Sequence, residues 1–507
     1  MALHPAGEHL AARAAMHPDQ PAVVMAGSGT VRTYAELDAA ATRLALVLRD
    51  RGLRTGDRLA VLVENGPSFF EVVWAAMRTG LHVVPVNWHL RAEEAGFIVA
   101  DSGARALVVS AQLGEVVAAL APDDLAGLDH RWSVGGVVDG FEPLDEVLAD
   151  AAVGEVPDEH EGGWMFYSSG TTGRPKGIVP PLPPAPLGAP SFLTAMLGGL
   201  FGFGDDTVYL NPAPLYHAAP AGWTTGTHRL GGTVVVMERF DPRGLLAAVE
   251  RHRVTHVQLV PTHMVRLLEL PAAERDRHDL SSLRCVVHAA APCPPEVKRA
   301  FMDWVGPVVH EYYSGSEGVG FCCIGPEEWL AHPGSVGRSL GGAIHVLGPD
   351  GEELPPGEEG EVWFETTRTF EYHNDPDATA AAFDERGWSW LGDLGRVDED
   401  GYLYLTDRAG NLIISGGVNI SPRESEDVLI GHPAVADVAV VGTPDPEMGE
   451  RVTAFVQPAP GAVVSGDELV AWCRERLSHY KCPSEVRFVD ELPRLPTGKL
   501  LKRLLST

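Results

Sequence analysis

Short apolar runs alternate with amphipathic segments through most of this chain. Runs 58–63, 83–86 and 106–110 have the apolar character of buried strands, and helical patterns stand between them, for example at 69–78. Strands that alternate with amphipathic helices are typical of a parallel sheet, because each parallel strand needs a crossover connection. The pattern therefore predicts an α/β fold. The alternation returns later, with strands expected at 233–237, 257–260 and 285–288 and helices at 242–251, 264–268 and 295–304.

One helix can be located from its first residues. Thr33 stands three residues before Glu36, which is the spacing of a capping box, and an amphipathic pattern then continues to about Arg51. Residues 8–20 also have a helical pattern, and a strand is expected directly after them at 22–25.

The length of the chain indicates more than one domain. A chain of 507 residues is too long for a single hydrophobic core. From about Gly334 the pattern changes to short strands with glycine turns, which predicts a small β-rich subdomain. Residues 406–411 are turn-like, and the residues after them alternate strand and helix on a smaller scale. We expect a large N-terminal domain of parallel α/β sheets with the β-rich subdomain at 1–407, a hinge at 408–411 and a small α+β C-terminal domain at 412–507.

The charge and the apolar content exclude several classes of partner. The formal net charge is −30, which argues against nucleic acid or an anionic membrane as the main partner. No run of about 18 apolar residues suggests a membrane span, and the first residues lack the basic and apolar regions of a signal peptide. A cytoplasmic protein is therefore expected. The six cysteines show no Cys-x-x-Cys or zinc-ligand spacing, so we expect reduced thiols.

The loop at 167–178 carries the residue types that a polyphosphate needs. Its glycines let the backbone approach phosphate oxygens, and consecutive N–H groups in such a turn form an anion-binding concavity. Its hydroxyl groups add donors, and Lys176 adds a positive charge. Only five of the 39 basic residues are lysines, so a lysine here is not a casual surface choice. The spacing is not the Walker pattern, which ends in Gly-Lys-Ser or Gly-Lys-Thr, and the alternative is a mobile polar loop.

Prolines crowd the stretch 180–190, directly after this loop. Such a segment is stiff and extended. It suits a surface linker and a lid equally well.

Further motifs follow the loop in a fixed order. They are Tyr312-Tyr313-Ser314-Gly315-Ser316-Glu317-Gly318, Trp390-Leu391-Gly392-Asp393, Asp407-Arg408, Ile413-Ile414-Ser415-Gly416-Gly417-Val418-Asn419-Ile420 and Pro496-Thr497-Gly498-Lys499. Together with the loop, this set resembles the adenylate-forming superfamily of acyl-CoA synthetases, luciferases and peptide-synthetase adenylation domains, over nearly the whole chain. Within it, Pro214-Leu215-Tyr216-His217 and Leu495-Pro496-Thr497-Gly498-Lys499-Leu500 look most like bacterial fatty-acyl or aryl-CoA ligases.

The resemblance implies a reaction in two steps. The carboxylate of a small-molecule acid attacks the α-phosphate of ATP, pyrophosphate leaves and an acyl adenylate forms; the thiol of CoA then displaces AMP. The first step brings one anion onto another, so charge neutralisation and alignment dominate its barrier. Mg²⁺ is the expected metal, because a hard cation suits a carboxylate and phosphate oxygens. The expected partners are the acid, ATP and CoA, and relatives of this kind are monomers or homodimers.

Residue roles carry over from the motifs. By resemblance, Lys499 bridges the substrate carboxylate and the α-phosphate, Glu317 binds Mg²⁺, and His217 is an aromatic gate between the acid pocket and the nucleotide. These three are the expected catalytic residues, although a purely structural histidine is the alternative for His217. The expected nucleotide-binding residues form the phosphate loop and the walls around base and ribose: Ser168, Ser169, Gly170, Thr171, Thr172, Gly173, Lys176, Ala290, Ala291, Tyr313, Ser316, Asp393 and Arg408.

The resemblance also assigns the acid pocket, the CoA entrance and the hinge. The small domain is expected to be mobile and to turn about Gly410 between the two steps, since glycine permits backbone angles closed to other residues. Gly416 and Gly417 are expected to line the entrance for the CoA thiol, with a plain turn as the alternative. The pocket suits an aryl, cinnamate-like or medium-chain acid, and its expected residues are His217, Trp223, Val260, His288 and Ser314.

Other functions remain open at this point. By the resemblance, Ser421 stands where a ring is usual near the CoA entrance, and a glycine stands at the hinge, so acceptors other than CoA stay open. The same adenylation could serve carrier-protein loading, or ATP-dependent diazotisation of an aromatic amine with nitrite in secondary metabolism. The third hypothesis is a non-catalytic nucleotide-binding scaffold. A scaffold has no need of a metal-binding carboxylate and a distant lysine together, so a ligase is our main hypothesis.

Overall fold

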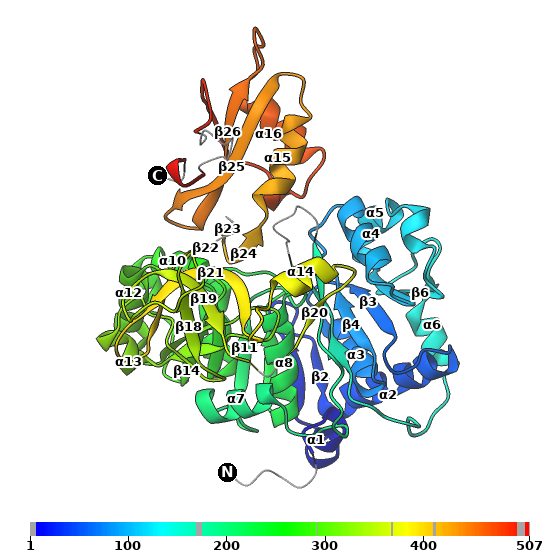
Figure 1. The fold of residues 1–507 in the computed structure, drawn as a ribbon. Helices are drawn as coiled ribbons and strands as arrows, with labels where there is room; N and C mark the ends of the chain where they lie inside the picture. The colour runs from blue at the N-terminus through cyan, green and yellow to red at the C-terminus, as the bar shows by residue number, and fades with distance from the viewer. Residues whose placement is uncertain are drawn as a thin grey trace.

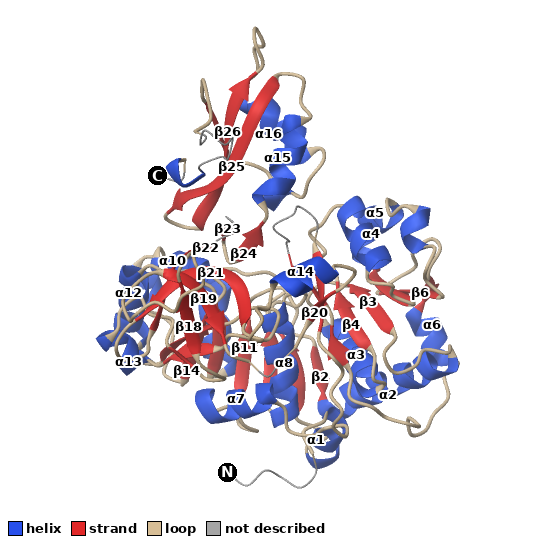
Figure 2. Ribbon diagram, viewed as in Figure 1, coloured by secondary structure: helices blue, strands red, loops and turns tan. Residues whose placement is uncertain are grey.

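A small domain stands on a much larger body in this protein (Figure 1). The computed structural model describes residues 7–168, 175–291, 293–366, 369–408, 412–493 and 502–505. The body contains the residues up to Arg408, and the small domain begins with the strand at Ile413. Strands and helices alternate through most of the body, as the sequence predicts, and the α/β class of the fold is confirmed (Figure 2).

The larger sheet of the body has nine strands. Its central strands are parallel, and antiparallel strands stand at both edges. In spatial order the strands are β17 (Arg338–Ser339), β16 (Cys322–Ile324), β15 (Val309–Tyr313), β14 (Cys285–His288), β13 (His256–Leu259), β11 (Val208–Asn211), β12 (Thr233–Val236), β1 (Pro21–Met25) and β2 (Val31–Thr33).

The second large sheet has six strands, all parallel. In spatial order they are β7 (Glu142–Pro143), β6 (His130–Val134), β5 (Ala106–Ser110), β3 (Arg58–Leu62), β4 (His82–Pro85) and β8 (Gly163–Trp164).

Helices α2 (Tyr34–Asp50) and α3 (Pro67–Arg78) fill the space between the two large sheets. Phe70 and Trp74 of α3 are almost completely buried in one apolar cluster with strands of both sheets. The predicted capping box of α2 is confirmed: the N–H of Glu36 donates to Oγ1 of Thr33 at 3.2 Å, and the N–H of Thr33 donates to Oε2 of Glu36 at 2.9 Å. This reciprocal pair satisfies two free donors at the start of the helix.

The outer faces of the sheets are covered by separate sets of helices. Helices α9 (Pro242–His252), α10 (Pro261–Leu268) and α12 (Pro295–Val305) cover the nine-stranded sheet, and α4 (Ala92–Asp101) and α5 (Gly114–Ala118) cover the six-stranded one. The other helices of the body are α1 (Leu10–Met16), α6 (Leu144–Ala149), α7 (Phe192–Phe201), α8 (Ala218–Leu230), α11 (Ala272–Arg275), α13 (Pro326–Ala331) and α14 (Pro376–Ala381), with short 3₁₀ turns at Ala111–Leu113 and Pro122–Leu125.

Two small antiparallel sheets complete the body. The predicted β-rich subdomain is confirmed as a sheet of four strands, in the order β18 (Ile344–Leu347), β19 (Gly360–Phe364), β21 (Ser389–Val397) and β22 (Leu403–Arg408). A sheet of three strands joins β20 (Glu371–Tyr372), β10 (Lys176–Val179) and β9 (Phe166–Ser168).

The small domain is an α+β unit with its own apolar core. Its sheet contains β24 (Val418–Ile420), β23 (Ile413–Ser415), β26 (Gly449–Pro458), β25 (Val435–Asp445) and β27 (Glu485–Phe488). Helices α15 (Pro422–Ile430) and α16 (Gly466–Arg474) pack on it, and short 3₁₀ turns occur at η3 (His479–Lys481) and η4 (Lys502–Leu504). In the described part of the chain, no helix has the length and apolar character needed to cross a membrane.

The structure differs from the sequence prediction at the end of the body. A turn is predicted from residue 406, yet β22 continues to Arg408, with Asp407 opposite Leu394 and Arg408 opposite Asp393. Pairing with β21 holds these residues extended.

The proline-rich stretch 180–190 is tied to the body near both ends. The carbonyl of Pro180 lies 3.3 Å from Nε2 of His82, and the N–H of Gly188 donates to Oε2 of Glu161 at 3.1 Å. The carbonyl of Gly188 also accepts from the N–H of Glu8 at 2.6 Å. These contacts support a fixed surface connection more than a lid.

Candidate functional site

The carboxyl ends of β14 and β15 meet at one edge of the nine-stranded sheet. The two strands are parallel neighbours with His288 opposite Glu311, so the segments that follow them lie together. In open α/β sheets such an edge is where ligands bind. Ala290, just after β14, has a φ of +74°, which is rare for a residue with a side chain. Backbone strain of this kind gathers at functional sites.

Tyr313 and Asp393 are joined directly at this edge. The hydroxyl of Tyr313 donates to Oδ2 of Asp393 at 2.5 Å, although the two residues are 80 positions apart. Asp393 is only 3% exposed and lies opposite Arg408 in the β21–β22 ladder. The side chain of Arg408 is outside the part of the chain that the structure describes. The fold thus brings together two of the expected nucleotide-binding residues, one an aromatic ring suited to a base and one a carboxylate suited to ribose hydroxyls.

A second contact links the phosphate loop to the predicted metal carboxylate. The hydroxyl of Tyr372 on β20 donates to Oε1 of Glu317 at 2.8 Å. Nζ of Lys176 lies 5.4 Å from the centre of the Tyr372 ring and pairs with Oδ2 of Asp375 at 3.0 Å. Lys176 and Glu317 are therefore held on two sides of one tyrosine. Tyr372 and Asp375 could not be predicted as site residues from the sequence, because a strand of two residues has no recognisable pattern.

The ends of the phosphate loop are strand partners. Ser168 closes β9 and lies opposite Lys176, which opens β10, so the loop joins two antiparallel strands. Several expected residues lie outside the described ranges, and their roles stay predictions: Ser169, Gly170, Thr171, Thr172, Gly173, Gly410 and Lys499.

His217 stands in an aromatic group at the start of α8. Its ring lies 4.4 Å from that of Tyr216, which in turn lies 6.1 Å from Trp88 and 6.3 Å from His89, all measured between ring centres. Burial, together with the nearby His89, lowers the pKa of His217 to about 4. The imidazole is therefore neutral near pH 7, which suits an aromatic wall better than a charged partner for a carboxylate.

Two of the expected pocket residues lie on opposite faces of the sheet. Trp223 of α8 is 3% exposed and stacks on Tyr312 with ring centres 5.6 Å apart. The imidazole of His288 is completely buried on the other face, with Nε2 3.4 Å from Oε2 of Glu311, next to Lys298 of α12. The two side chains do not face one another, and their joint role in an acid pocket stays a prediction.

The other two pocket candidates lie closer to the small domain or to the strand end. Ser314 directly follows Tyr313, and its hydroxyl donates to the carbonyl of Val319 at 3.2 Å. Val260 is the single residue between the end of β13 and the start of α10. A Cβ added to Gly417 would lie 3.0 Å from Cγ1 of Val260, so the glycine pair of the small domain approaches the body there.

An ion pair lies beneath the strand ends. Nζ of Lys298 is 2.7 Å from Oε2 of Glu311, and both side chains are at least nine-tenths buried. Sequence reasoning gave Lys298 no role. The chain has only five lysines, and this rarity is the one sequence feature that could have drawn attention to Lys298.

The arrangement fits a metal that is shared with phosphate oxygens. Among the described residues, no group of three or more His, Cys, Asp or Glu side chains is placed to hold a metal ion. Mg²⁺ is usually bound by one or two carboxylates, water and substrate phosphates instead of a protein cage. Glu317, half-buried and oriented by Tyr372, suits such a site.

Fold and site together define a nucleotide-binding α/β enzyme that carries a small appended domain. The AMP-binding enzyme family matches residues 10–371, and the family of its C-terminal domain matches residues 424–499. This chain belongs to the AMP-binding enzyme family and is an adenylate-forming ligase.

Relatives are similar over nearly the whole chain. A feruloyl-CoA synthase of Amycolatopsis is 38% identical, over 97% of this chain and 96% of the relative. The solved structure of the amide bond synthetase McbA from Marinactinospora thermotolerans has a TM-score of 0.84 and 31% identity, over 98% of this chain and 99% of that one.

A third relative, the o-succinylbenzoate CoA synthetase of Bacillus subtilis, is known in more than one state. A double mutant bound to a product analogue, OSB-NCoA, has a TM-score of 0.83 at 29% identity, over 98% of both chains. The same synthetase bound to its acyl-adenylate intermediate has a TM-score of only 0.67 at 29% identity, over 99% of this chain and 98% of that one. The structure of this chain is therefore more similar to the product-analogue state than to the adenylate-bound state, although the sequence identity is the same for both.

Proposed function

We propose that this enzyme activates a carboxylic acid with ATP as an acyl adenylate and transfers the acyl group to CoA. The observation that carries the proposal is a pair of contacts at and just after the end of β15. Tyr313, which ends that strand, bonds Asp393, and Glu317, four residues later, bonds Tyr372, whose ring lies beside Lys176. An aromatic ring beside a carboxylate suits a base and a ribose, and a lysine near a carboxylate that can hold Mg²⁺ suits a triphosphate. The family assignment and the CoA-ligase relatives support the same chemistry.

The chain contributes charge and alignment to each step. In the first, a substrate carboxylate oxygen bonds to the α-phosphorus, and the bond to the bridging oxygen breaks to release pyrophosphate. Lys176 and Lys499 offset the charge of the phosphates, and Glu317 would hold Mg²⁺, which supplies further positive charge when bound. In the second step, the sulfur of CoA bonds to the acyl carbon and AMP leaves.

We propose an aryl or cinnamate-like acid as the substrate, with a medium-chain fatty acid as the alternative. The feruloyl-CoA synthase among the relatives supports the aryl class. The neutral aromatic group around His217 and Tyr216 supports it as well, since rings favour stacking with a flat apolar acid. Because His217 is neutral, the negative charge of the substrate carboxylate must be offset by the lysines.

The test is a pyrophosphate-release screen of the purified enzyme over aryl, cinnamate-like, medium-chain and short acids. We expect release with an aryl acid, and consumption of CoA in step with pyrophosphate. Release that never depends on an acid would contradict the proposal. Nitrite with an arylamine belongs in the same screen, because release that needs both would indicate diazotisation.

A second acceptor class deserves a place in the screen. The structure of the amide bond synthetase McbA is as similar to this chain as that of the CoA synthetase, with TM-scores of 0.84 and 0.83. An amine is therefore the second candidate acceptor. Amide formation without CoA consumption would favour it, and a carrier-protein thiol is tested in the same way.

We also propose that the chain pivots between β22 and β23, about Gly410, so that the body ends near 407 and the mobile domain begins near 412. The end of β22 and the separate core of the small domain support this division. The higher score against the product-analogue state supports a thiol-transfer orientation of the small domain in this structure. Cytoplasmic location and a monomer or homodimer stay predictions.

Tyr372 provides a test of the proposed metal site. We expect Tyr372→Phe to weaken Mg²⁺-dependent ATP binding by about tenfold, because the hydroxyl that orients Glu317 is lost while the ring beside Lys176 remains. Titration calorimetry of ATP with and without Mg²⁺ measures this, and binding without Mg²⁺ should change little. Tyr402→Phe is the control. It removes a similar hydrogen bond, from the Tyr402 hydroxyl to Oε1 of Glu328 at 3.1 Å, and this bond lies outside the site. Equal losses in the two variants would refute the role of Tyr372.

A further inference from the structure

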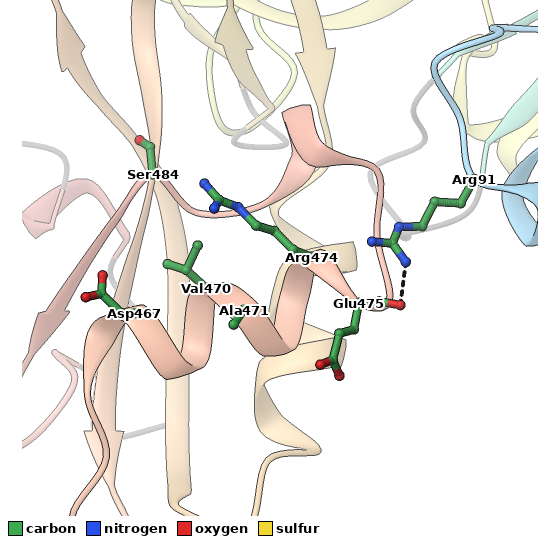
Figure 3. A pocket seen from close by; sticks show the side chains of 7 residues that line it. All are labelled: Arg91, Asp467, Val470, Ala471, Arg474, Glu475 and Ser484. Atoms are coloured by element: carbon green, nitrogen blue, oxygen red, sulfur yellow. Dashed lines mark hydrogen bonds between the residues drawn. The ribbon is translucent and has the colours of Figure 1, made fainter.

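A short segment of the small domain, residues 475–482, docks on the start of α4 in the body. We call it the docking segment. Nε of Arg91 donates to the carbonyl of Leu477 at 2.7 Å, and Nη1 of Arg91 donates to the carbonyl of Glu475 at 2.5 Å (Figure 3). The N–H of Arg91 also donates to Oγ of Ser478 at 3.2 Å. Arg91 therefore binds two backbone carbonyls of the segment that directly follows α16.

A buried lysine joins the two parts of the molecule. Nζ of Lys481 lies 2.6 Å from Oε1 of Glu94 on α4 and 2.6 Å from Oε2 of Glu424 on α15. The side chain of Lys481 is 3% exposed, and those of Glu94 and Glu424 are 13% and 7% exposed. Ser478 also donates to Glu94. One cation is thus shared between a carboxylate of the body and a carboxylate of the small domain.

The electrostatics favour the charged form of this lysine. Burial acts to lower the pKa of Lys481, but Tyr480, Glu424 and Glu94 together raise it above the ordinary lysine value. Without Glu94, the same cation would keep only one carboxylate partner. Contacts between the two parts are therefore worth more here than at an exposed ion pair, where solvent weakens the attraction.

The docking segment also touches the loop that carries the aromatic group near His217. The side-chain amide of Asn87 lies 3.5 Å from the hydroxyl of Tyr480. The next residues, Trp88 and His89, contact Tyr216. The docking segment therefore contacts the loop whose rings pack beside Tyr216, the neighbour of His217.

A second contact between the two parts lies on the other side of the body. Nε of Arg266 on α10 pairs with Oε1 of Glu447 at 2.6 Å, and both side chains are about two-fifths exposed. Gly417 of the small domain approaches Val260, which directly precedes α10. The two contacts lie on α4 and α10, on either side of the body below the small domain (Figure 1). When the docking segment is bound, the predicted CoA entrance therefore faces the β13–α10 connection.

We propose that Glu94 and Lys481 form an interdomain latch that holds the small domain in the orientation for thiol transfer. The latch rests on the proposed function, and it opens when the small domain turns to bring Lys499 to the phosphates. Glu94 and Lys481 are positioning residues, since neither needs to touch a substrate. The latch favours the second half-reaction, whereas the first half-reaction requires that it open.

The test separates the two half-reactions in Glu94→Gln. Glutamine keeps the acceptor oxygen for the N–H of Arg91 and removes the charge that holds Lys481. We expect transfer from preformed acyl adenylate to CoA to slow by about tenfold, since one charged hydrogen bond between the domains is weakened. Acid-dependent exchange of pyrophosphate with ATP should not slow, because a weaker latch makes it easier for the small domain to turn toward the phosphates. Glu93→Gln, an exposed neighbour in the same helical turn, should change neither rate.

Hydrogen–deuterium exchange tests the latch without relying on catalysis. We expect Glu94→Gln to speed exchange in 87–95 and in the docking segment, while the melting temperature and the exchange of β3 and β5 stay unchanged. Unchanged protection in both segments would overturn the latch, and so would equal slowing of the two half-reactions. If wild-type enzyme shows no acid-dependent exchange of pyrophosphate, the proposed function fails, while the exchange data still decide whether the latch exists.

Discussion

Lys499→Ala is expected to abolish acid-dependent adenylation while ATP still binds. By its motif, this lysine places a cation between the substrate carboxylate and the α-phosphate at the moment when negative charge meets negative charge. Removing one such group from a water-poor site typically slows a step by about 100-fold to 1000-fold. Exchange of pyrophosphate with ATP measures the step, and calorimetry measures ATP binding. All the residues proposed to contact the base, ribose and phosphates of ATP, apart from Lys499, belong to the body, so we expect the affinity for ATP to change by less than about threefold.

Lys502→Ala is the matched control. Lys502 stands three residues later on η4, where its Nζ pairs with Oε1 of Glu426 at 2.6 Å inside the small domain. We expect normal adenylation from this variant. If Lys499→Ala forms adenylate at the wild-type rate, the role assigned to the C-terminal motif is wrong. If both lysine variants lose the activity, the small domain has been damaged as a whole, and the Lys499 result says nothing about chemistry. Thermal melting distinguishes these outcomes.

Local patterns in the sequence predict the regular part of this fold well. The strand at 285–288 and the helix that Thr33 opens are found where hydrophobic periodicity and the capping box place them. Both features depend on residues within one helical turn or one strand. Patterns of this length determine the element types, and their alternation determines the α/β class.

Contacts between segments that are far apart in the sequence could not be predicted from local patterns. The bond from Tyr372 to Glu317 spans 55 positions, and β20 is too short to show a period. The end of β22 could not be predicted for the same reason. Asp407 and Arg408 have turn-like composition, but pairing with β21 holds them extended. Motif order predicted Tyr313 and Asp393 as members of one site, whereas the hydrogen bond between them is known only from the fold.

The interdomain latch could not be predicted for the same reason. Glu94 and Lys481 are 387 positions apart, and each looks like an ordinary charged residue in its own segment. Only the burial of Lys481 between two carboxylates marks it as unusual. The rarity of lysine in this chain is a weak hint that points to Lys298 and Lys481 alike.

The buried pair of Lys298 and Glu311 carries the largest expected effect on stability. Lys298 is completely buried, its Nζ lies 2.7 Å from Glu311, and it lies 4.7 Å from the centre of the Trp329 ring. Burial lowers the pKa of Lys298 and raises the pKa of Glu311, and each charge opposes the effect of burial on the other. His288 cannot replace the lysine, because burial holds its pKa well below the usual value.

Lys298→Met should therefore lower the free energy of unfolding of the body by about 3–5 kcal/mol, since it leaves a carboxylate buried without a counter-charge. Lys298→Met with Glu311→Leu is the matched control: an apolar pair of similar volume is often neutral or stabilising, so the double variant should recover most of the loss. Urea unfolding followed by tryptophan fluorescence measures both. The two residues sit under the strand ends that carry Ala290 and Tyr313, so the single variant should also weaken ATP binding. A single variant within about 1 kcal/mol of wild type would show that water or a neighbouring group already compensates Glu311.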